Sequence, residues 1–256
     1  MSEQLALLLK DLRLPGFRSS YQEVADTAEQ QGWSFVDYLT HLAEMELEGR
    51  QHRRIQRNLR RSKLPREKTL STLEQERLDR KVRRKIPTLC KGGFADRAEN
   101  ILLFGLPGRG KTHLACAIGH ELIQRDYRVL FTPTFRLVQQ LLQAKQGLEL
   151  EDLLRKLDRF DVIILDDIGY VQQERAEMEV LFTLLAERYE RKSMVITSNL
   201  VFSKWDQIFK DAMTTAAAID RVVHHSTILE LTGSSYRTDA AQQRQTDTNE
   251  DSDHEE

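Results

Sequence analysis

The stretch NILLFGLPGRGKTHLACAIGHEL, residues 100–122, decides the fold of this chain. Within it, GLPGRGKT (Gly105–Thr112) fits the phosphate-loop pattern G-x-x-x-x-G-K-[ST] at every fixed position. The apolar run ILLF (101–104) before the loop predicts a buried strand, and the residues after the loop predict a helix. A glycine-rich loop between a strand and a helix is the context in which this pattern binds nucleotide phosphates. The stretch therefore predicts a nucleotide-binding α/β core.

Each part of this loop has an expected role in binding ATP and Mg²⁺. Lys111 is expected to reach the β- and γ-phosphates, and the hydroxyl of Thr112 is expected to bind Mg²⁺. The backbone N–H groups of the loop are expected to surround the β-phosphate. The residues expected to contact the nucleotide are Gly105, Pro107, Gly108, Arg109, Gly110, Lys111, Thr112 and His113.

A nucleotide-hydrolysing site also needs acidic residues, and VIILDDIG (162–169) supplies them at the end of an apolar run. Asp166 is expected to hold Mg²⁺ through water, and Asp167 to orient or deprotonate the attacking water. The alternative is an ordinary strand that ends in two acids at a turn. The phosphate loop at a suitable distance upstream favours the catalytic interpretation.

Two further polar residues are candidates for the same site. Asn199 in MVITSNL follows a predicted strand, where it could contact the γ-phosphate and the attacking water or simply cap the next turn. Thr197 and Ser198 in the same run are weaker candidates. Arg221 in AAAIDRVVHH lies late in a predicted helix, where it is either a solvated helix-end charge or a finger supplied to the γ-phosphate of a neighbouring subunit. The second interpretation requires an oligomer.

A helix predicted from His41 to Arg61 carries a one-sided stripe of positive charge. At 100° per residue, four arginines of this helix fall within roughly 60° of one another, while Met45, Ile55 and Leu59 lie toward the opposite side. The stripe is Arg50, Arg54, Arg57 and Arg61. Like charges stacked along one face repel each other, which favours contact with a polyanion that compensates them. The alternative is a solvated helical face. No aromatic residues alternate with the arginines, which favours the phosphates of duplex DNA over single-stranded bases.

The rest of the chain predicts a mostly parallel sheet covered by helices, preceded by a helical region. Five apolar runs alternate with helical stretches, at residues 101–104, 128–132, 161–166, 194–198 and 227–231. We expect a helical N-terminal domain at 1–65 for partner or DNA binding, a connector at 66–95 broken by Pro87 and KGG, an ATPase domain at 96–240, and a disordered acidic tail at 241–256.

Composition adds three expectations. No run approaches the roughly 18 apolar residues of a membrane span, and the N-terminus carries acids early, so we expect a cytoplasmic protein without a signal peptide. Cys90 and Cys116 are expected to be reduced thiols. Four histidines, at positions 113, 120, 224 and 225, have no Cys or acidic partner at ligand spacing and are expected to be surface or helix-end residues.

The chain resembles the IstB-like ATP-binding proteins, helper ATPases of bacterial insertion sequences that are related to the DnaC helicase loaders. The stretches that carry the resemblance span about residues 10–238 and include LPREKTLSTLE, GLPGRGKTHLA, VIILDDIGY, ITSNLVFSKWDQIF and AAAIDRVVHHSTILELTGSSYR. The resemblance implies an AAA+ fold in which Asn199 is the first sensor and Arg221 the finger that acts in a neighbouring subunit. It also implies ATP-dependent assembly on duplex DNA, with recruitment and activation of an IstA-like transposase at a selected target site.

Two departures from the usual AAA+ pattern bear on activity. The second acid is usually Glu, and here it is Asp167, one methylene shorter, so slow hydrolysis is expected. We expect no full helical lid in the residues after 231, which leaves Arg237 as the one stand-in for a second sensor arginine. The leading alternative is a DnaC-like helicase loader that prefers single-stranded DNA. A small-molecule kinase on the same core would need a lid on the same chain, which we do not expect.

Overall fold

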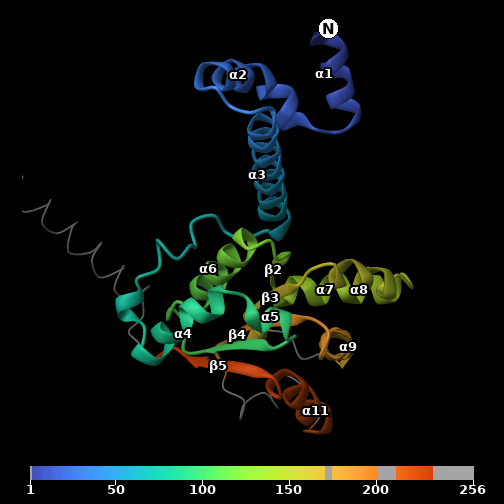
Figure 1. Cartoon of the computed structure of the whole chain (residues 1–256). Helices are drawn as coiled ribbons and strands as arrows, with labels where there is room; N and C mark the ends of the chain where they lie inside the picture. Colours follow the sequence, from blue (N-terminus) through green and yellow to red (C-terminus); the bar gives the residue numbers. More distant parts are fainter. Residues whose placement is uncertain (1, 171–174, 201–211, 233–256) are drawn as a thin grey trace, which may run out of the picture. The chain divides into compact units, whose positions relative to one another are not determined.

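The computed structural model describes residues 2–170, 175–200 and 212–232 of the chain (Figure 1). The chain divides into two compact units, Met1–Arg57 and Asn58–Glu256, and the division falls inside the long helix α3. Arg237 and the acidic tail at 241–256 lie outside the described residues. The described helices are α1 Ser2–Asp11, α2 Pro15–Gln31, α3 Phe35–Ser62, η1 Gln75–Arg77, α4 Arg80–Cys90, α5 Gly93–Asp96, α6 Lys111–Gln124, α7 Thr134–Gln146, α8 Leu150–Asp158, η2 Ile168–Tyr170, α9 Arg175–Arg188 and α11 Ala212–Val223.

The first unit consists of α1, α2 and most of α3, as the helical pattern of the sequence predicts. Helix α2 ends at Gly32, which has a left-handed backbone (φ 66°) that an L-residue adopts only at a cost. Ser34 and Asp37 then form a reciprocal cap: the Asp37 amide donates to Ser34 Oγ and the Ser34 amide to Asp37 Oδ2, both at 3.2 Å. Because the cap starts α3 at Phe35, this helix is longer than the predicted His41–Arg61.

The segment between the two predicted domains is more helical than expected, because α4 runs through Pro87. The prediction that Pro87 interrupts helical structure is therefore wrong. A proline inside a helix costs about 3 kcal/mol. Val82, Ile86 and Leu89 of the same helix are buried, and each buried side chain of this size contributes about 1.5–3 kcal/mol. Burial of this apolar face therefore offsets the free-energy cost of placing Pro87 inside the helix.

The second unit is built on a five-stranded sheet in which every neighbouring pair is parallel, and this confirms the predicted α/β core. The strand order is β2-β3-β4-β1-β5. The strands are β1 Asn100–Phe104, β2 Val129–Pro133, β3 Val162–Asp166, β4 Ser193–Ser198 and β5 Ser226–Glu230. Each lies within one residue of its apolar run in the sequence, because the central strands are buried and read as continuous apolar segments.

Helices cover both faces of this sheet. Alternate strand residues such as Leu102, Ile163 and Ile196 join the core formed with α7, α9 and α11. The opposite face carries α6, where Gly119 lies so close to the sheet that an added Cβ would be 2.8 Å from Ile164 Cδ1. In a parallel sheet all strands end at one edge, so the loops after β1, β3 and β4 meet there.

Two expectations from composition can be compared with the structure. In the described ranges, no helix combines the length and the apolar character that crossing a membrane requires. Cys90 and Cys116 are both free and buried, as predicted. Burial raises the pKa of the two thiols, to about 11 for Cys90 and about 12 for Cys116, so both are protonated at neutral pH.

Candidate nucleotide-binding site

The glycine-rich loop lies between the end of β1 and the start of α6, as the sequence predicts. Gly108 and Gly110 both have φ of 80°, in the left-handed region where a side chain would be strained. Gly110 is the N-cap of α6 and no side chain caps that end of the helix. The first N–H groups of this 14-residue helix therefore point into the loop, where the helix dipole favours an anion.

The side chain of Lys111 is folded back into the loop. Lys111 is only 8% exposed, and its Nζ donates hydrogen bonds to the carbonyl oxygens of Gly105 at 2.7 Å and Leu106 at 3.0 Å. These contacts hold a positive charge beside the backbone donors of the loop. The arrangement suits a di- or triphosphate, whose negative charge both the lysine and the helix end would stabilise.

The carboxylate of Asp166 joins the loop to the ends of two strands. Its Oδ1 accepts hydrogen bonds from the hydroxyls of Thr112 and Thr197, each at 2.8 Å. The hydroxyl of Thr134 donates to the main-chain carbonyl of the same aspartate at 2.9 Å. The two residues predicted to hold Mg²⁺, Thr112 and Asp166, are thus in direct contact, and they offer a hydroxyl and a carboxylate oxygen.

Asp167 occupies a strained turn directly after β3. Its φ is 61°, in the left-handed region, and its amide donates to Thr197 Oγ1 at 2.8 Å. Thr197 therefore bonds to both acids, to the side chain of Asp166 and to the backbone of Asp167. Holding a non-glycine residue in this conformation costs of order 1–3 kcal/mol, and such strain is concentrated at functional sites. The sequence marked Thr197 only as a weak candidate, and the structure gives it a central position.

Asn199 lies at the same edge of the sheet, after β4. Its Oδ1 is buried and has no hydrogen-bond partner among the described residues. Gly169 makes room for this group, because a Cβ at that position would lie 2.2 Å from Oδ1. A buried amide oxygen without a partner costs free energy, so its presence here indicates a site that is completed by a ligand or by water.

These residues surround a cavity of about 230 Å³. Its lining includes Lys68, Leu73, Pro107, Gly108, Arg109, Gly110, Lys111, Thr112, His113, Asp167, Thr197 and Asn199. Lys68 and Leu73 come from the segment between the predicted domains, to which the sequence assigned no contact with the nucleotide. His113 Nε2 fixes that segment, at 3.0 Å from the Thr69 carbonyl oxygen and 3.1 Å from Thr72 Oγ1.

Arg221 is not among the residues that line the cavity of its own chain. It lies in the last turn of α11, with its guanidinium carbon 4.6 Å from the centre of the Phe182 ring on α9. Its Nη1 is buried and has no hydrogen-bond partner among the described residues. The structure therefore brings together the phosphate loop, both acids and Asn199, and leaves Arg221 outside that group.

The predicted arginine stripe lies on α3, and its four members are exposed. Arg50 is already engaged: Nε bonds to Glu46 Oε1 at 2.8 Å and Nη2 to the Arg13 carbonyl at 2.9 Å. Burial alone would raise the pKa of Glu46, but hydrogen bonds from Arg50 and the Gly16 amide lower it. Arg50 thus stabilises the turn before α2, a contact that helical spacing could not reveal.

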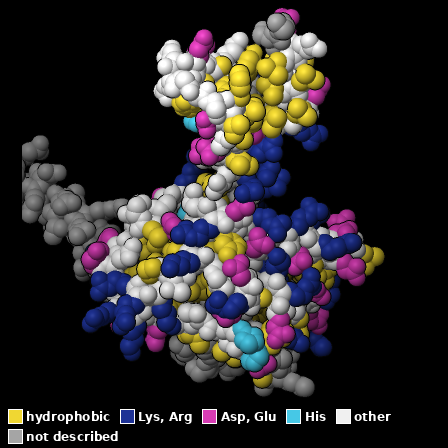
Figure 2. All heavy atoms as spheres, viewed as in Figure 1, with side chains coloured by type: hydrophobic (Ala, Val, Ile, Leu, Met, Phe, Trp, Pro, Cys, Tyr) yellow, Lys and Arg dark blue, Asp and Glu magenta, His cyan; other side chains and the backbone are white. Residues whose placement is uncertain are grey.

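Three further basic residues of the second unit lie in the last turns of α7 and α8. Lys145 pairs with Glu179 at 2.7 Å, Arg155 pairs with Asp152, and Lys156 is exposed. A second basic surface lies on α4 (Figure 2), where Arg80, Lys81, Arg83, Arg84 and Lys85 are exposed.

Comparison with known proteins agrees with this site. Residues 7–245 match the sequence profile of a family described as IstB-like ATP binding protein. The chain is 44% identical over 239 residues to the putative insertion sequence ATP-binding protein y4iQ/y4nD/y4sD of Sinorhizobium fredii, which covers 93% of this chain and 80% of that protein. It is 38% identical over 237 residues to the insertion sequence IS5376 putative ATP-binding protein of Geobacillus stearothermophilus, with 93% and 94% covered.

Solved structures with the same fold include DnaI and DnaA. This chain resembles DnaI, with a TM-score of 0.56 and 23% identity over 66% of this chain and 95% of that chain. AMPPCP-bound DnaA from Aquifex aeolicus gives a TM-score of 0.55 with 17% identity, over 66% of this chain and 51% of that chain. At these identities the likeness establishes the fold alone.

Proposed function

This chain belongs to the family of IstB-like ATP binding proteins and is an AAA+ ATPase, and on this premise we propose that it assembles on duplex DNA with ATP and recruits and activates a transposase. The relatives described above are insertion sequence proteins, which supports a role in transposition. In this proposal the product is a protein–DNA assembly at a selected target site, and the DNA itself is not chemically changed.

The position of Arg221 is the observation that best supports the proposed oligomer. The lining of the cavity in the same chain includes Lys111, Asp167 and Asn199, and Arg221 is not among its lining residues. An arginine that stabilises the charge of phosphoryl transfer must touch the γ-phosphate. We therefore assign Arg221 to the site of an adjacent subunit, where ATP would lie at the interface and strengthen the assembly.

The phosphate loop has the groups that ATP binding requires. Lys111 and the N–H groups at the start of α6 would bind the β- and γ-phosphates. Thr112 and Asp166 suit Mg²⁺, because their hydroxyl and carboxylate oxygens are the hard ligands this ion prefers and they already lie 2.8 Å apart. When bound, Mg²⁺ neutralises charge on the phosphate oxygens.

Asp167 and Asn199 are the residues we assign to the attacking water. Both line the cavity with Thr197, and the buried Oδ1 of Asn199 can accept a hydrogen bond from that water. The Asp167 carboxylate would orient the water and accept its proton. Because aspartate is shorter than the glutamate usual at this position, we expect a slow turnover that assembly and partner binding can control.

Replacing Thr197 with Val tests the hydroxyl that joins the two acids. We expect kcat for ATP hydrolysis to fall by about 10–100-fold with little change in ATP affinity, since partners behind the metal-binding carboxylate typically have effects of this size. Single-turnover hydrolysis and nucleotide-binding titrations separate the two quantities. The matched control is Thr183→Val, because the Thr183 hydroxyl only bonds the Glu179 carbonyl within helix α9. An unchanged kcat in Thr197→Val would contradict the assignment.

DNA binding is assigned to the exposed arginines of α3. Arg54, Arg57 and Arg61 project from one side of this helix and are exposed. Contacts of this kind to phosphates give affinity that does not depend on sequence and that falls steeply with salt.

Changing Arg57 and Arg61 together to Gln is expected to weaken duplex binding at all sequences. Each lost phosphate contact lowers the slope of log K against log salt by about 1, so the slope should fall by about 2 in the double variant. Fluorescence anisotropy over a salt series measures it. The control is Arg97→Gln with Arg125→Gln, which removes the same charge from arginines paired with Glu99 and Glu121. Equal slopes in the two double variants would argue against the α3 stripe as the DNA surface.

The proposal as a whole is tested by the size of the assembly. Sedimentation of the full chain with ATP should give large complexes on duplex DNA that disperse at high salt and after hydrolysis. A small complex that prefers single-stranded DNA would favour the alternative, a helicase loader. Turnover that is indifferent to DNA and to protein concentration would refute assembly on DNA altogether.

A further inference from the structure

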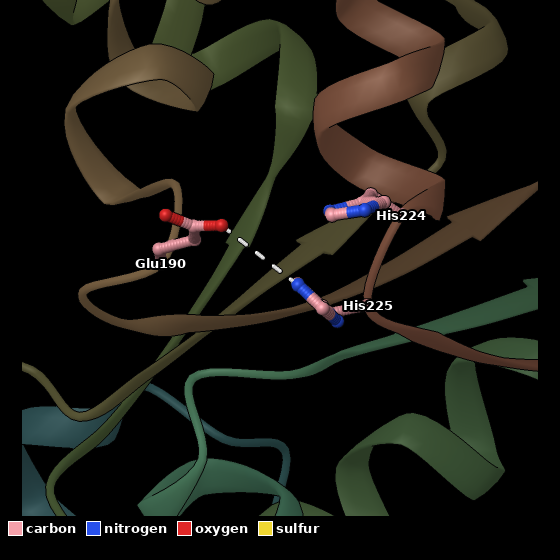
Figure 3. Close-up of side chains that lie close together, drawn as sticks. All are labelled: Glu190, His224 and His225. Carbon is pink, nitrogen blue, oxygen red and sulfur yellow. Dashed lines mark ion pairs between the residues drawn. The ribbon is translucent and has the colours of Figure 1, made fainter.

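Glu190, His224 and His225 meet at the edge of the sheet opposite the phosphate loop. Glu190 lies in the turn that leads into β4, and the two histidines lie between α11 and β5 (Figure 3). The strands are parallel, so their beginnings lie at the far edge from Gly105–Thr112, which follows β1. In the sequence these histidines have no acidic partner at ligand spacing, but the fold brings Glu190, which lies 34 residues before His224, next to them.

We propose that these three side chains bind one transition-metal ion of the Zn²⁺ type. One nitrogen of each imidazole and one carboxylate oxygen of Glu190 all lie within 4.8 Å of one another. His225 Nε2 is 3.8 Å from Glu190 Oε1, and the two imidazole rings are 4.1 Å apart between centroids (Figure 3). Tetrahedral Zn²⁺ with bonds of about 2.0–2.1 Å needs ligand atoms about 3.4 Å apart. Small side-chain rotations are enough, because all three residues are exposed.

The backbone that carries these ligands is well fixed. The amide of Asn100 donates to the His225 carbonyl at 2.7 Å, and the amide of His224 donates to the Asp220 carbonyl at 2.9 Å. The turn around Glu190 is closed by the amides of Arg191 and Lys192, which donate to the Arg188 carbonyl at 3.1 and 3.0 Å. Because the backbone at Glu190 and at the two histidines is already ordered, less conformational entropy would be lost when a metal binds.

A neighbouring tyrosine orients one of the two imidazoles. The hydroxyl of Tyr189 lies 3.0 Å from Nδ1 of His224. Histidines that bind metals almost always donate their second ring N–H to such an oxygen, which fixes the tautomer and leaves the other nitrogen for the metal. With Nδ1–H donated to Tyr189, Nε2 of His224 is the nitrogen that faces an ion.

The ligand types select the metal. Two imidazole nitrogens and one carboxylate form a set that suits Zn²⁺, Co²⁺, Ni²⁺ or Cu²⁺, while Mg²⁺ and Ca²⁺ prefer oxygen ligands alone. With three protein ligands, the fourth position is open to water. The site is therefore chemically distinct from the Mg²⁺ ligands proposed at Thr112 and Asp166. A bound ion would join the turn after α9 to the end of α11, the helix that carries Arg221.

The test is Zn²⁺ binding by the untagged full-length chain after treatment with a chelator. Competition against a chromophoric zinc chelator, in a buffer with millimolar Mg²⁺ and ATP, should give one Zn²⁺ per chain, and Zn²⁺ should raise the melting temperature. Glu190→Gln and a double His224→Gln, His225→Gln variant should lose the zinc-dependent shift, and Tyr189→Phe should bind about tenfold more weakly. His52→Gln, which removes an exposed histidine of α3, is the matched control and should bind as the parent does.

Two results would overturn the proposal. Zinc bound equally by the double histidine variant would mean that the ion is held elsewhere. Zinc displaced by millimolar Mg²⁺ with ATP would mean that the ion occupies the nucleotide site. Because neither readout depends on ATP hydrolysis or DNA, a failure here leaves the proposed function untouched.

Discussion

Replacing Lys111 with Met is expected to reduce ATP hydrolysis by about 10²–10³-fold and to leave the chain folded. The ammonium group is held inside the phosphate loop, where it donates to the carbonyls of Gly105 and Leu106. Removing one preorganised donor from a site of developing charge typically costs a factor of this size. The lysine would also bind the phosphates of ATP before reaction, so nucleotide affinity should fall as well.

Steady-state phosphate release and binding of a fluorescent ATP analogue measure the two effects of Lys111→Met. The control is Lys145→Met, which removes a lysine that pairs with Glu179 on the surface of the same unit. It should keep nearly full activity, since exposed ion pairs contribute about 0–1 kcal/mol. Hydrolysis by Lys111→Met at more than a tenth of the parent rate would mean that the loop does not bind the reacting phosphates.

Replacing Arg188 with Met is expected to cause the largest loss of stability. Arg188 is 1% exposed, and its guanidinium donates hydrogen bonds to four backbone carbonyl oxygens. The acceptors are the carbonyls of Leu157, Phe160, Asp161 and Ser193, at 3.0–3.3 Å. Burial lowers the pKa of Arg188 to about 10, so the group is still charged at neutral pH.

The cost of Arg188→Met follows from those carbonyls. Methionine fills a similar volume but donates nothing, and each buried acceptor left without a partner costs about 1–3 kcal/mol. We expect a loss above about 3 kcal/mol and a fall in melting temperature of roughly 10 °C. The control is Arg191→Met, three residues on, whose ion pairs with Asp158 and Glu187 are exposed. Equal melting temperatures for the two variants would mean that Arg188 does not hold β3, β4 and α8 together.

Local signals in the sequence predicted the sheet and the centre of the site. The strands were found within one residue because buried parallel strands are continuous apolar runs bounded by polar turns. Lys111, Thr112, Asp166, Asp167 and Asn199 could be identified as candidates because each lies at or soon after the end of a strand, and parallel strands end at a common edge. Their mutual contacts, such as Thr112 with Asp166, then follow from the topology.

Contacts between distant segments were not predictable. Lys68 and Leu73 reach the cavity only because His113 holds their segment against α6, and no local pattern encodes that hydrogen bond. Helix α4 was missed because Pro87 predicts a helix break from local sequence alone. In the folded chain, burial of the apolar face of the helix compensates for the proline. The stripe on α3 was found by angular spacing, but the pairing of Arg50 with the buried Glu46 depends on the turn before α2.

The most direct test of ATP shared between subunits is a mixture of two inactive chains. Lys111→Met has a disabled loop and an intact Arg221, while Arg221→Ala has an intact loop and no finger. Each alone should hydrolyse ATP slowly on duplex DNA. A mixture that associates at random should form about a quarter of its interfaces with one intact loop and one intact arginine, and activity should reappear to that extent. Chains that assemble together yet stay as inactive as each alone would contradict an arginine finger supplied by a neighbour.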